Sequence, residues 1–175
     1  MKRNPNQRVG VFVDVQNMYY SAKNLYGRRV NFSQILNTAV EGRQLIRAIA
    51  YVIKASMPEE QSFFDALEKA GFEVKSKEVQ IFPGGVKKGD WDVGIALDMI
   101  RLAPRLDAMI LVSGDGDYVP LVEYLKNQGH RVEVIAFGKS TSAKLIAEVD
   151  DFTDMDEDHG KFVFQAKEKK SPNQN

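Results

Sequence analysis

Two aspartates lie close together in a short glycine-rich turn. Asp115 and Asp117 follow an apolar run, 109–112, and precede residues with helical apolar spacing, 118–126. Because two ionised carboxylates in one tight turn repel each other, a positive partner is expected there. The amino end of the following helix supplies part of that charge, and a divalent metal ion supplies more. A purely structural alternative is that Asp117 is the N-cap of this helix.

Three more polar residues occur at the ends of predicted elements elsewhere in the chain. Asp14 closes an apolar strand, 8–15, where a lone carboxylate is costly to desolvate. Asn17 follows in the first turn of the next helix, where turn and cap residues are also common. Asp92 falls in the first turn of a helix predicted over 90–102, where the helix dipole favours an anion.

Taken together, the four aspartates predict a metal site. Four carboxylates cannot all ionise in a dry pocket without a compensating cation. Oxygen ligands without His or Cys select Mg²⁺ or Mn²⁺. One or two such ions can activate water and stabilise the leaving oxygen of a phosphodiester. We therefore predict catalytic and metal-ligating roles for Asp14, Asp92, Asp115 and Asp117.

The elements that position these residues alternate between strands and helices. Strands are predicted over 8–15, 44–53, 72–79, 107–112 and 130–137. This order predicts an α/β fold with a mainly parallel central sheet and helices on both faces. Right-handed crossovers bring the carboxyl ends of all parallel strands to one edge. In the strand order 3-2-1-4-5 the first and fourth strands are neighbours, and ligands bind at the switch point between them.

The helix predicted over 90–102 carries two further aspartates and an apolar face. Asp90 can cap it, and Asp98 lies further along on a different face. Asp98 is expected to pair with Arg101 or Arg105, although a role in the site stays open. The apolar face of the helix is expected to comprise Val93, Ala96, Leu97 and Ile100.

Two loops complete the candidate substrate surface. The loop at 81–89 is basic because of Lys87 and Lys88. It is either an exposed hairpin-like excursion or a mobile arm near the site. The hydroxyls at 140–142, which include Thr141, either cap the last helix of the chain or bind phosphate at its amino end.

Length and composition indicate one domain. A chain of 175 residues suits a single core, which we place at 8–155. A flexible N-terminus, 1–7, precedes it, and a polar, largely disordered tail, 156–175, follows it. Residues 150–153 are expected to add a short edge strand.

Composition also excludes several classes of function. The 24 basic and 24 acidic residues give a net charge of zero, which does not indicate a globally basic nucleic-acid binder. The absence of cysteine excludes disulfides, zinc–thiolate sites and cysteine nucleophiles. No stretch is long and apolar enough to cross a membrane, and the polar start lacks a hydrophobic signal segment. A cytoplasmic protein without a membrane partner is therefore expected.

Three segments form a combined motif: VDVQN at 13–17, KGDWDV at 88–93 and LVSGDGDY at 111–118. Together they resemble the NYN domain family, in particular its LabA-like bacterial branch, within the PIN-like nuclease superfamily. The resemblance covers residues 8–155, where DDF at 150–152 also fits the pattern. It implies a PIN-like three-layer α/β/α fold, an acidic Mg²⁺ or Mn²⁺ site, and RNA as the substrate.

The resemblance also assigns individual residues. Asp14 matches the first acidic residue of the family motif, and Asn17 matches the asparagine that follows it. Asp115 and Asp117 match its Ser-Gly-Asp-x-Asp turn, with Ser113 as the serine.

The lysine-glycine element of the family departs from the usual spacing. One residue is inserted here, so that Lys88 and Gly89 are followed by two aspartates, Asp90 and Asp92. Helix phase and the following Val93 favour Asp92 as the match.

These observations predict a metal-dependent ribonuclease that acts as an endoribonuclease. Asp14 and Asp115 would hold the metal, and Asp92 and Asp117 would complete its shell or orient water. Substrate contacts are predicted for Asn17, Ser113, Lys88 and Thr141, and further RNA contacts for Lys87 and Arg131.

The leading alternative is a catalytically weak or inactive NYN-type regulator that binds RNA, a nucleotide or a protein partner, since many LabA-like members resemble regulators. A third function, a small phosphohydrolase, is disfavoured. Asp14 is followed by Val15 and Gln16 rather than by the second aspartate of haloacid-dehalogenase-type phosphatases, and there is no P-loop. The sequence leaves open the RNA target, the number of metal ions and assembly as a homodimer.

Overall fold

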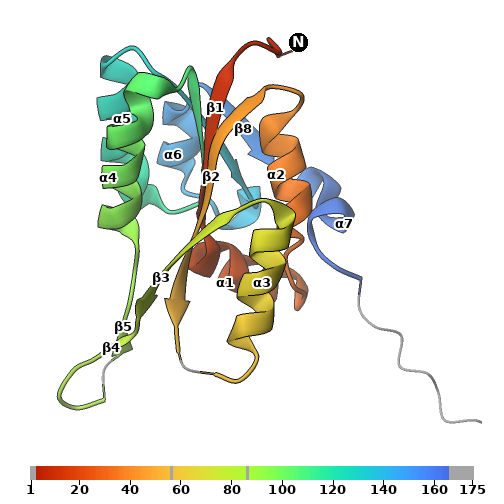
Figure 1. Cartoon of the computed structure of the whole chain (residues 1–175), viewed down its shortest axis with the longest axis vertical. Coiled ribbons are helices and arrows are strands. Elements are labelled where there is room, and N and C mark those ends of the chain that lie inside the picture. Colours follow the sequence, from red (N-terminus) through yellow and green to blue (C-terminus); the bar gives the residue numbers. More distant parts are fainter. Residues whose placement is uncertain (1–2, 56, 86, 166–175) are drawn as a thin grey trace, which may run out of the picture.

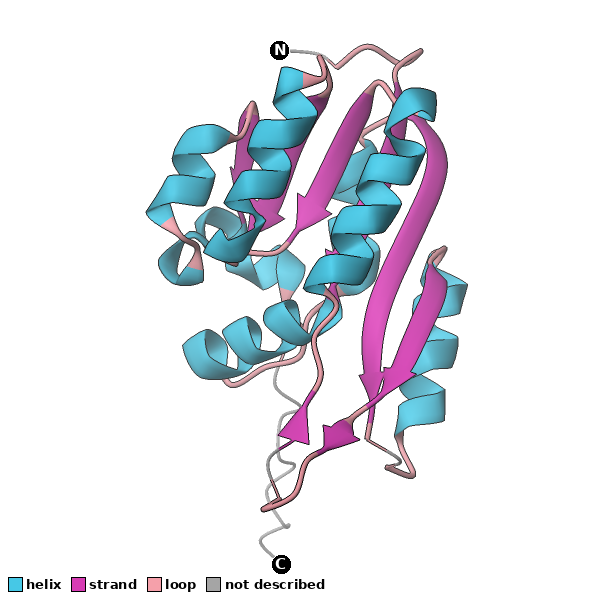
Figure 2. Cartoon of the chain, turned by 90° about the vertical axis from the view of Figure 1, so that its left-hand side faces the viewer, coloured by secondary structure: helices cyan, strands magenta, loops and turns pink. Residues whose placement is uncertain are grey.

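A parallel β-sheet forms the centre of the protein. The computed structural model describes residues 3–55, 57–85 and 87–165, with Lys87 and Lys88 described by their backbone alone. Within these residues the sheet has six strands in the order β3-β2-β1-β6-β7-β8, and every neighbouring pair is parallel (Figure 2). The strands are β1 (Arg8–Asp14), β2 (Gln44–Lys54), β3 (Glu73–Glu78), β6 (Ala108–Val112), β7 (Arg131–Ala136) and β8 (Asp151–Asp154).

Helices cover both faces of this sheet. In Figure 1, α4 and α5 lie on one side of the strands, and α2 and α3 lie on the other. The helices are α1 (Val15–Tyr26), α2 (Phe32–Val40), α3 (Glu60–Ala70), α4 (Asp92–Leu102), α5 (Val119–Asn127), α6 (Ala143–Glu148) and α7 (His159–Phe162). Short 3₁₀ turns are η1 (Ala103–Arg105), η2 (Gly116–Tyr118), η3 (Gly138–Ser140) and η4 (Met155–Asp158). None of the helices in the described ranges is long and apolar enough to span a bilayer.

The predicted fold class is confirmed. The predicted strand order 3-2-1-4-5 corresponds to β3-β2-β1-β6-β7, and the predicted edge strand is present as β8. The central strands form because their side chains are apolar on both faces, as a parallel sheet under two helical layers requires. Phe12 and Val13 of β1 and Ile110 and Leu111 of β6 are fully buried.

The predicted apolar face of α4 is wrong except for Ala96, which is partly buried against the core. Val93, Leu97 and Ile100 are exposed. The helix instead buries Ile95, Met99 and, between them, the carboxylate of Asp98. Two apolar stripes run along this helix, and the choice between them depends on partners elsewhere in the chain.

Asp98 is buried because distant side chains satisfy it. Its Oδ2 accepts hydrogen bonds from the Tyr51 hydroxyl at 2.8 Å and from Lys75 Nζ at 2.7 Å. The predicted partner Arg101 is more distant, at 3.9 Å from Oδ1. These hydrogen bonds satisfy the buried carboxylate of Asp98, which therefore has a structural role between α4, β2 and β3.

The amino end of α4 also differs from the prediction. Trp91, not Asp90, is the N-cap residue, and its side chain makes no capping bond. The indole instead donates to the carbonyl of Val52 at 2.8 Å, at the end of β2. A Cβ at Gly94 would lie 2.5 Å from this indole, so only glycine leaves room for it. Trp91 therefore fixes the first turn of α4 to the sheet.

The loop predicted over 81–89 contains a small hairpin. β4 (Gln80–Ile81) pairs antiparallel with β5 (Lys87–Lys88), and the hairpin projects beyond the carboxyl ends of the sheet strands (Figures 1 and 2). The hairpin-like alternative is therefore correct for the backbone. The side chains of Lys87 and Lys88, which are predicted to contact RNA, lie outside the described part of the structure.

The folded body continues past the predicted boundary at residue 155. η4 and α7 follow β8, so α6 is not the last helix. Phe162 and Val163 are buried, and the backbone N–H of Phe164 donates to the carbonyl of Arg29 at 2.8 Å. Apolar side chains within a polar stretch anchor this segment against the core. The remainder of the predicted tail, 166–175, lies outside the described residues.

Candidate metal centre

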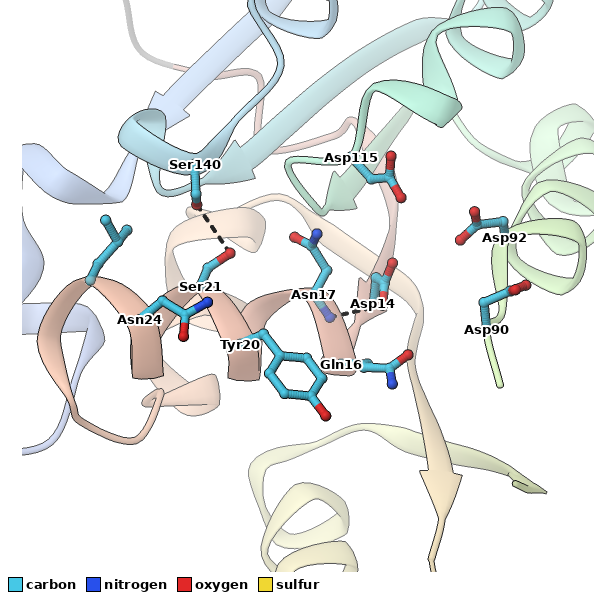
Figure 3. A pocket seen from close by; sticks show the side chains of 11 residues that line it. Asp14, Gln16, Asn17, Tyr20, Ser21, Asn24, Asp90, Asp92, Asp115 and Ser140 are labelled. Carbon is cyan, nitrogen blue, oxygen red and sulfur yellow. Dashed lines mark hydrogen bonds between the residues drawn. The ribbon is translucent and has the colours of Figure 1, made fainter. Parts of the chain in front are cut away.

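The residues predicted to converge leave the sheet at one edge. β1 ends at Asp14 and β6 ends at Val112, and the two strands pair so that Val13 lies opposite Val112. Asp14 and Ser113 therefore leave adjacent strands side by side. A pocket of about 460 Å³ opens at this point, and Figure 3 shows its side chains. Its lining includes Asp14, Asn17, Asp90, Asp92 and Asp115.

Three carboxylates form a compact acidic triad. One oxygen from each of Asp92, Asp115 and Asp117 lies within 4.8 Å of the others. Oxygens that bind one Mg²⁺ ion at about 2.1 Å lie at most about 4.2 Å apart, so small side-chain rotations bring these three to a common ion. Asp92 and Asp115 are half-buried and Asp117 is exposed. The triad is a candidate metal site, and its oxygen donors suit a hard divalent cation.

Asp14 lies beside the triad as a buried carboxylate. Its Oδ1 accepts the backbone N–H of Asn17 at 3.2 Å, so that Asp14 is the N-cap of α1. Its Oδ2 accepts from Tyr118 at 3.1 Å and from Ser113 Oγ at 3.5 Å. Burial raises the pKa of Asp14 to about 6, and the charges of Asp92 and Asp115 act in the same direction. The bonds from Asn17 and Tyr118 oppose this shift without cancelling it.

Tyr118 joins Asp14 to the triad. Its hydroxyl lies 3.1 Å from Asp14 Oδ2 and 3.1 Å from Asp92 Oδ1. A phenol carries one hydrogen and donates it to one acceptor at a time, so this group cannot satisfy both carboxylates. Burial raises the pKa of Asp92, and the charge of Asp115 raises it further, against the bond from Tyr118. The cluster therefore carries more negative charge than its own donors balance, which is the condition that a bound cation relieves.

Two of the predicted substrate-binding residues hold in place the turn 113–117, which carries Asp115 and Asp117 and is called the acidic turn below. The side-chain oxygen of Asn17 accepts the backbone N–H of Gly114 at 3.0 Å. The Ser113 hydroxyl accepts the backbone N–H of Asp115 at 3.2 Å, and Ser113 is fully buried. The Asn17 contact fixes the turn relative to α1, and the Ser113 contact stabilises the conformation of the turn itself. Asn17 also lines the pocket.

The structural alternative for Asp117, a role as N-cap, is not what the structure shows. The side chain of Asp115 accepts the backbone N–H of Asp117 at 2.9 Å and caps η2. Asp115, not Asp117, is therefore the capping residue of this turn. Pro120 lies in the first turn of α5, where its missing N–H removes no helical bond.

Thr141 packs against the acidic turn. Its hydroxyl donates to the carbonyl of Phe137 at 2.7 Å. A Cβ at Gly114 would lie 2.7 Å from Thr141 Oγ1, and a Cβ at Gly116 would lie 2.8 Å from Ser142 Oγ. Both glycines of the turn are therefore required by this close approach. The neighbouring Ser140 lines the pocket instead.

The structure places the remaining candidate site residues, Asp90 and Arg131, outside the triad. Asp90 lines the pocket at its exposed rim, whereas Asp92 belongs to the triad. Arg131 begins β7, at the opposite edge of the sheet from the pocket, and its Nε donates to Glu133 at 2.9 Å. The expectation that Arg131 contacts RNA at this site is therefore wrong.

Sequence reasoning overlooked part of the pocket wall. The helical spacing identifies Tyr118 only as an apolar residue, whereas its hydroxyl contacts Asp14 and Asp92, which are distant in the sequence. One face of α1 also lines the pocket. Its residues recur at helical spacing, which could have identified them: Gln16, Asn17, Tyr20, Ser21 and Asn24.

Comparisons with known proteins agree with this architecture. The NYN domain family matches residues 8–156. The low amplitude and bright protein LabA of Synechococcus elongatus is 24% identical over 158 residues, which cover 86% of this chain and 84% of that protein. The crystal structure of VPA0982, a protein of unknown function from Vibrio parahaemolyticus, has a TM-score of 0.84 at 36% identity. That match covers 94% of this chain and 100% of the other.

Proposed function

Because the chain belongs to the NYN domain family, we propose that it is a metal-dependent endoribonuclease that hydrolyses RNA phosphodiester bonds at the acidic pocket. One observation supports this most directly. Carboxylates from the start of α4 and from the turn after β6 reach within 4.8 Å of one another, beside the buried Asp14 at the end of β1. Structural roles for single aspartates do not explain why these separate segments bring their charges together.

Mg²⁺ or Mn²⁺ is the proposed cofactor. Asp92, Asp115 and Asp117 are its proposed ligands. Asp14, which shares the Tyr118 hydroxyl with Asp92, would contribute through a bound water. When bound, such an ion would polarise a phosphoryl oxygen and lower the pKa of a bound water.

The side chains of the chain itself would orient the reaction. Asp14 Oδ2 is the proposed acceptor for the proton of the attacking water, because it is a buried carboxylate oxygen directly beside the triad. The Tyr118 hydroxyl would donate to Asp14 or to Asp92, and so stabilise the charge of one of them at a time. Asn17 and Ser113 would keep the acidic turn in position.

The test is cleavage of labelled single-stranded RNA in the presence of Mn²⁺. Wild type should produce fragments, and Asp92→Asn and Asp14→Asn should lose most of this activity. Asp90→Asn is the matched control, because Asp90 lines the same pocket outside the triad, and it should retain activity. If wild type, Asp92→Asn and Asp14→Asn cleave equally, the activity comes from a contaminating nuclease and the proposal is contradicted.

A second function, a non-catalytic regulator, has one observation in its favour. Among the described side chains that line the pocket there is no lysine or arginine, so few protein charges are available to stabilise a phosphoryl transition state. Such a regulator would bind RNA or a nucleotide through the metal alone. Calorimetry with Mn²⁺ and RNA that shows binding without cleavage products would select this function.

A further inference from the structure

A second pocket adjoins the acidic one and differs from it in chemistry. It has a volume of about 390 Å³ and shares Gln16 and Tyr20 with the acidic pocket. The rest of its wall is mainly apolar and comes from α1, the end of β2 and α3. Its aromatic residues are Tyr19, Tyr20, Phe63 and Phe64.

The aromatic rings of this second pocket are unusually accessible. Tyr19 and Tyr20 are 47% and 51% exposed, and Phe63 is 38% exposed. The two tyrosines meet edge to face, with ring centroids 5.3 Å apart at an interplanar angle of 78°. This contact fixes the rings relative to each other while part of each stays open to solvent. Phe64 is buried and forms the floor.

Gln16 and Tyr20 form the wall between the two pockets. They lie four residues apart, and therefore on one face of α1, and Figure 3 shows them beside Asp14 and Asn17. A ligand that occupies both pockets must present anionic oxygens at one end and a flat apolar group at the other. A nucleotide has this combination, with its phosphate and base separated by one sugar.

We propose that the second pocket binds a nucleobase of single-stranded RNA next to the phosphate held at the acidic centre. This inference rests on the proposed function, because it takes the metal-bound phosphate as its starting point. Tyr19, Tyr20 and Phe63 offer stacking faces, and the Gln16 amide supplies both a donor and an acceptor for a base edge or a ribose hydroxyl. A paired base cannot enter, because duplex RNA keeps its bases stacked and out of reach of such a pocket.

The test measures RNA binding apart from cleavage. Fluorescence anisotropy with the full chain, Ca²⁺ in place of Mn²⁺ and a short labelled single-stranded RNA gives the affinity without turnover. Tyr20→Ala should weaken binding by roughly five- to a hundred-fold, the range expected for the loss of one base–aromatic stack. Tyr20→Phe should retain the affinity. Tyr124→Ala is the matched control, because Tyr124 is 48% exposed on α5, outside both pocket walls.

A strand of the same length with abasic sites separates stacking from other effects. Wild type should bind the abasic strand as weakly as Tyr20→Ala binds the normal strand. The affinity of Tyr20→Ala should fall little further when the normal strand is replaced by the abasic one. An equal loss for Tyr20→Ala on both strands, or no loss on either, would overturn the proposal, and the latter would favour a protein partner at this surface. Thermal unfolding of each variant shows whether the fold is intact, and an intact Tyr20→Phe with wild-type affinity keeps the test decisive.

The outcome is distinguishable from failure of the proposed ribonuclease. Base-dependent binding without Mn²⁺-dependent cleavage would support this pocket and contradict hydrolysis. Cleavage by wild type with no effect of Tyr20→Ala on either affinity or KM would support hydrolysis and overturn the base site.

Discussion

Replacement of Asp92 by asparagine should make the metal-free protein more stable. In the absence of a cation, Asp92 lies within 4.8 Å of two other carboxylates through the triad oxygens, and asparagine removes both repulsions. Two charges 4.8 Å apart repel by about 1 kcal/mol in a water-like medium and by about 3.5 kcal/mol at an effective dielectric constant near 20. Because Asp92 is only half-buried and therefore remains in contact with water, we take the lower figure for each pair.

The expected gain is therefore about 2 kcal/mol for the two repulsions together. For a chain of this length, this gain corresponds to a rise in Tm of about 4–8 °C. Asparagine keeps a carbonyl oxygen that can accept from Tyr118, so this contact need not be lost. Differential scanning calorimetry in EDTA measures the change.

Addition of Mn²⁺ should make wild type more stable than Asp92→Asn, the reverse of the order expected in EDTA. At a hundred times its Kd, a ligand that binds only the folded state stabilises it by about 2.7 kcal/mol. Wild type should gain this increment, and Asp92→Asn should gain much less, because one of the three ligands is missing. Asp90→Asn should behave like wild type in both conditions. If Asp92→Asn is less stable than wild type in EDTA and shows the same shift with Mn²⁺, the triad is not a metal site.

Four further predictions concern Asp14, the turn at Gly114 and the buried Arg43–Glu133 pair. Because Mn²⁺ competes with a proton on Asp14, whose pKa is raised to about 6, Mn²⁺ affinity by calorimetry should fall as the pH drops below about 6; a constant affinity would exclude Asp14 from the site. The folded state also binds that proton more tightly than the unfolded state, so the metal-free protein should lose stability as the pH rises from about 4 through about 6. Gly114→Ala should cost about 1–3 kcal/mol in denaturant unfolding and weaken Mn²⁺ binding, because its Cβ would lie 2.7 Å from Thr141 Oγ1; an unchanged affinity would show that the turn tolerates displacement. Glu133→Gln should cost about 3–5 kcal/mol, because it leaves the fully buried Arg43 guanidinium without its counter-ion, and a loss below 1 kcal/mol would contradict that role.

The convergence at the sheet edge was predictable because it follows from chain order. Alternating strands and helices indicate a parallel sheet, and right-handed crossovers bring the carboxyl ends of its strands to one edge. The strand order 3-2-1-4-5 then makes β1 and β6 neighbours, so that Asp14 and Asp115 lie close together. Asp92 joins them because the helix that leads into β6 must begin at the same edge.

Details that depend on long-range partners could not be read from local patterns. α4 carries two apolar stripes, and only Lys75 and Tyr51, from two other strands, decide that Asp98 faces inward. Likewise, α4 begins after Trp91, whose indole donates a hydrogen bond to the carbonyl of Val52 on β2. Periodicity describes one element at a time, so it identified the elements but not which face of α4 is buried.

The C-terminal segment shows the opposite error. Its polar composition suggested disorder, yet Met155, Phe162 and Val163 are buried, and backbone hydrogen bonds join the segment to Arg29 and Asn31. Composition averages over a window, whereas docking depends on one or two side chains that find a complementary site. The shared hydroxyl of Tyr118 was missed for a similar reason, since its role exists only once Asp14 and Asp92 have been brought together.

The pairing of β1 with β6 has a consequence for the way the protein is synthesised. Val13 and Val112 are neighbours in the sheet, so the ribosome must release most of the chain before the first strand can acquire one of its two partners. Until then β1 presents an open apolar edge, the kind of surface that invites aggregation. Parallel pairing across such sequence separation also slows folding. The nascent chain is therefore expected to depend on chaperones until β6 has emerged, and the acidic pocket to be among the last features to form.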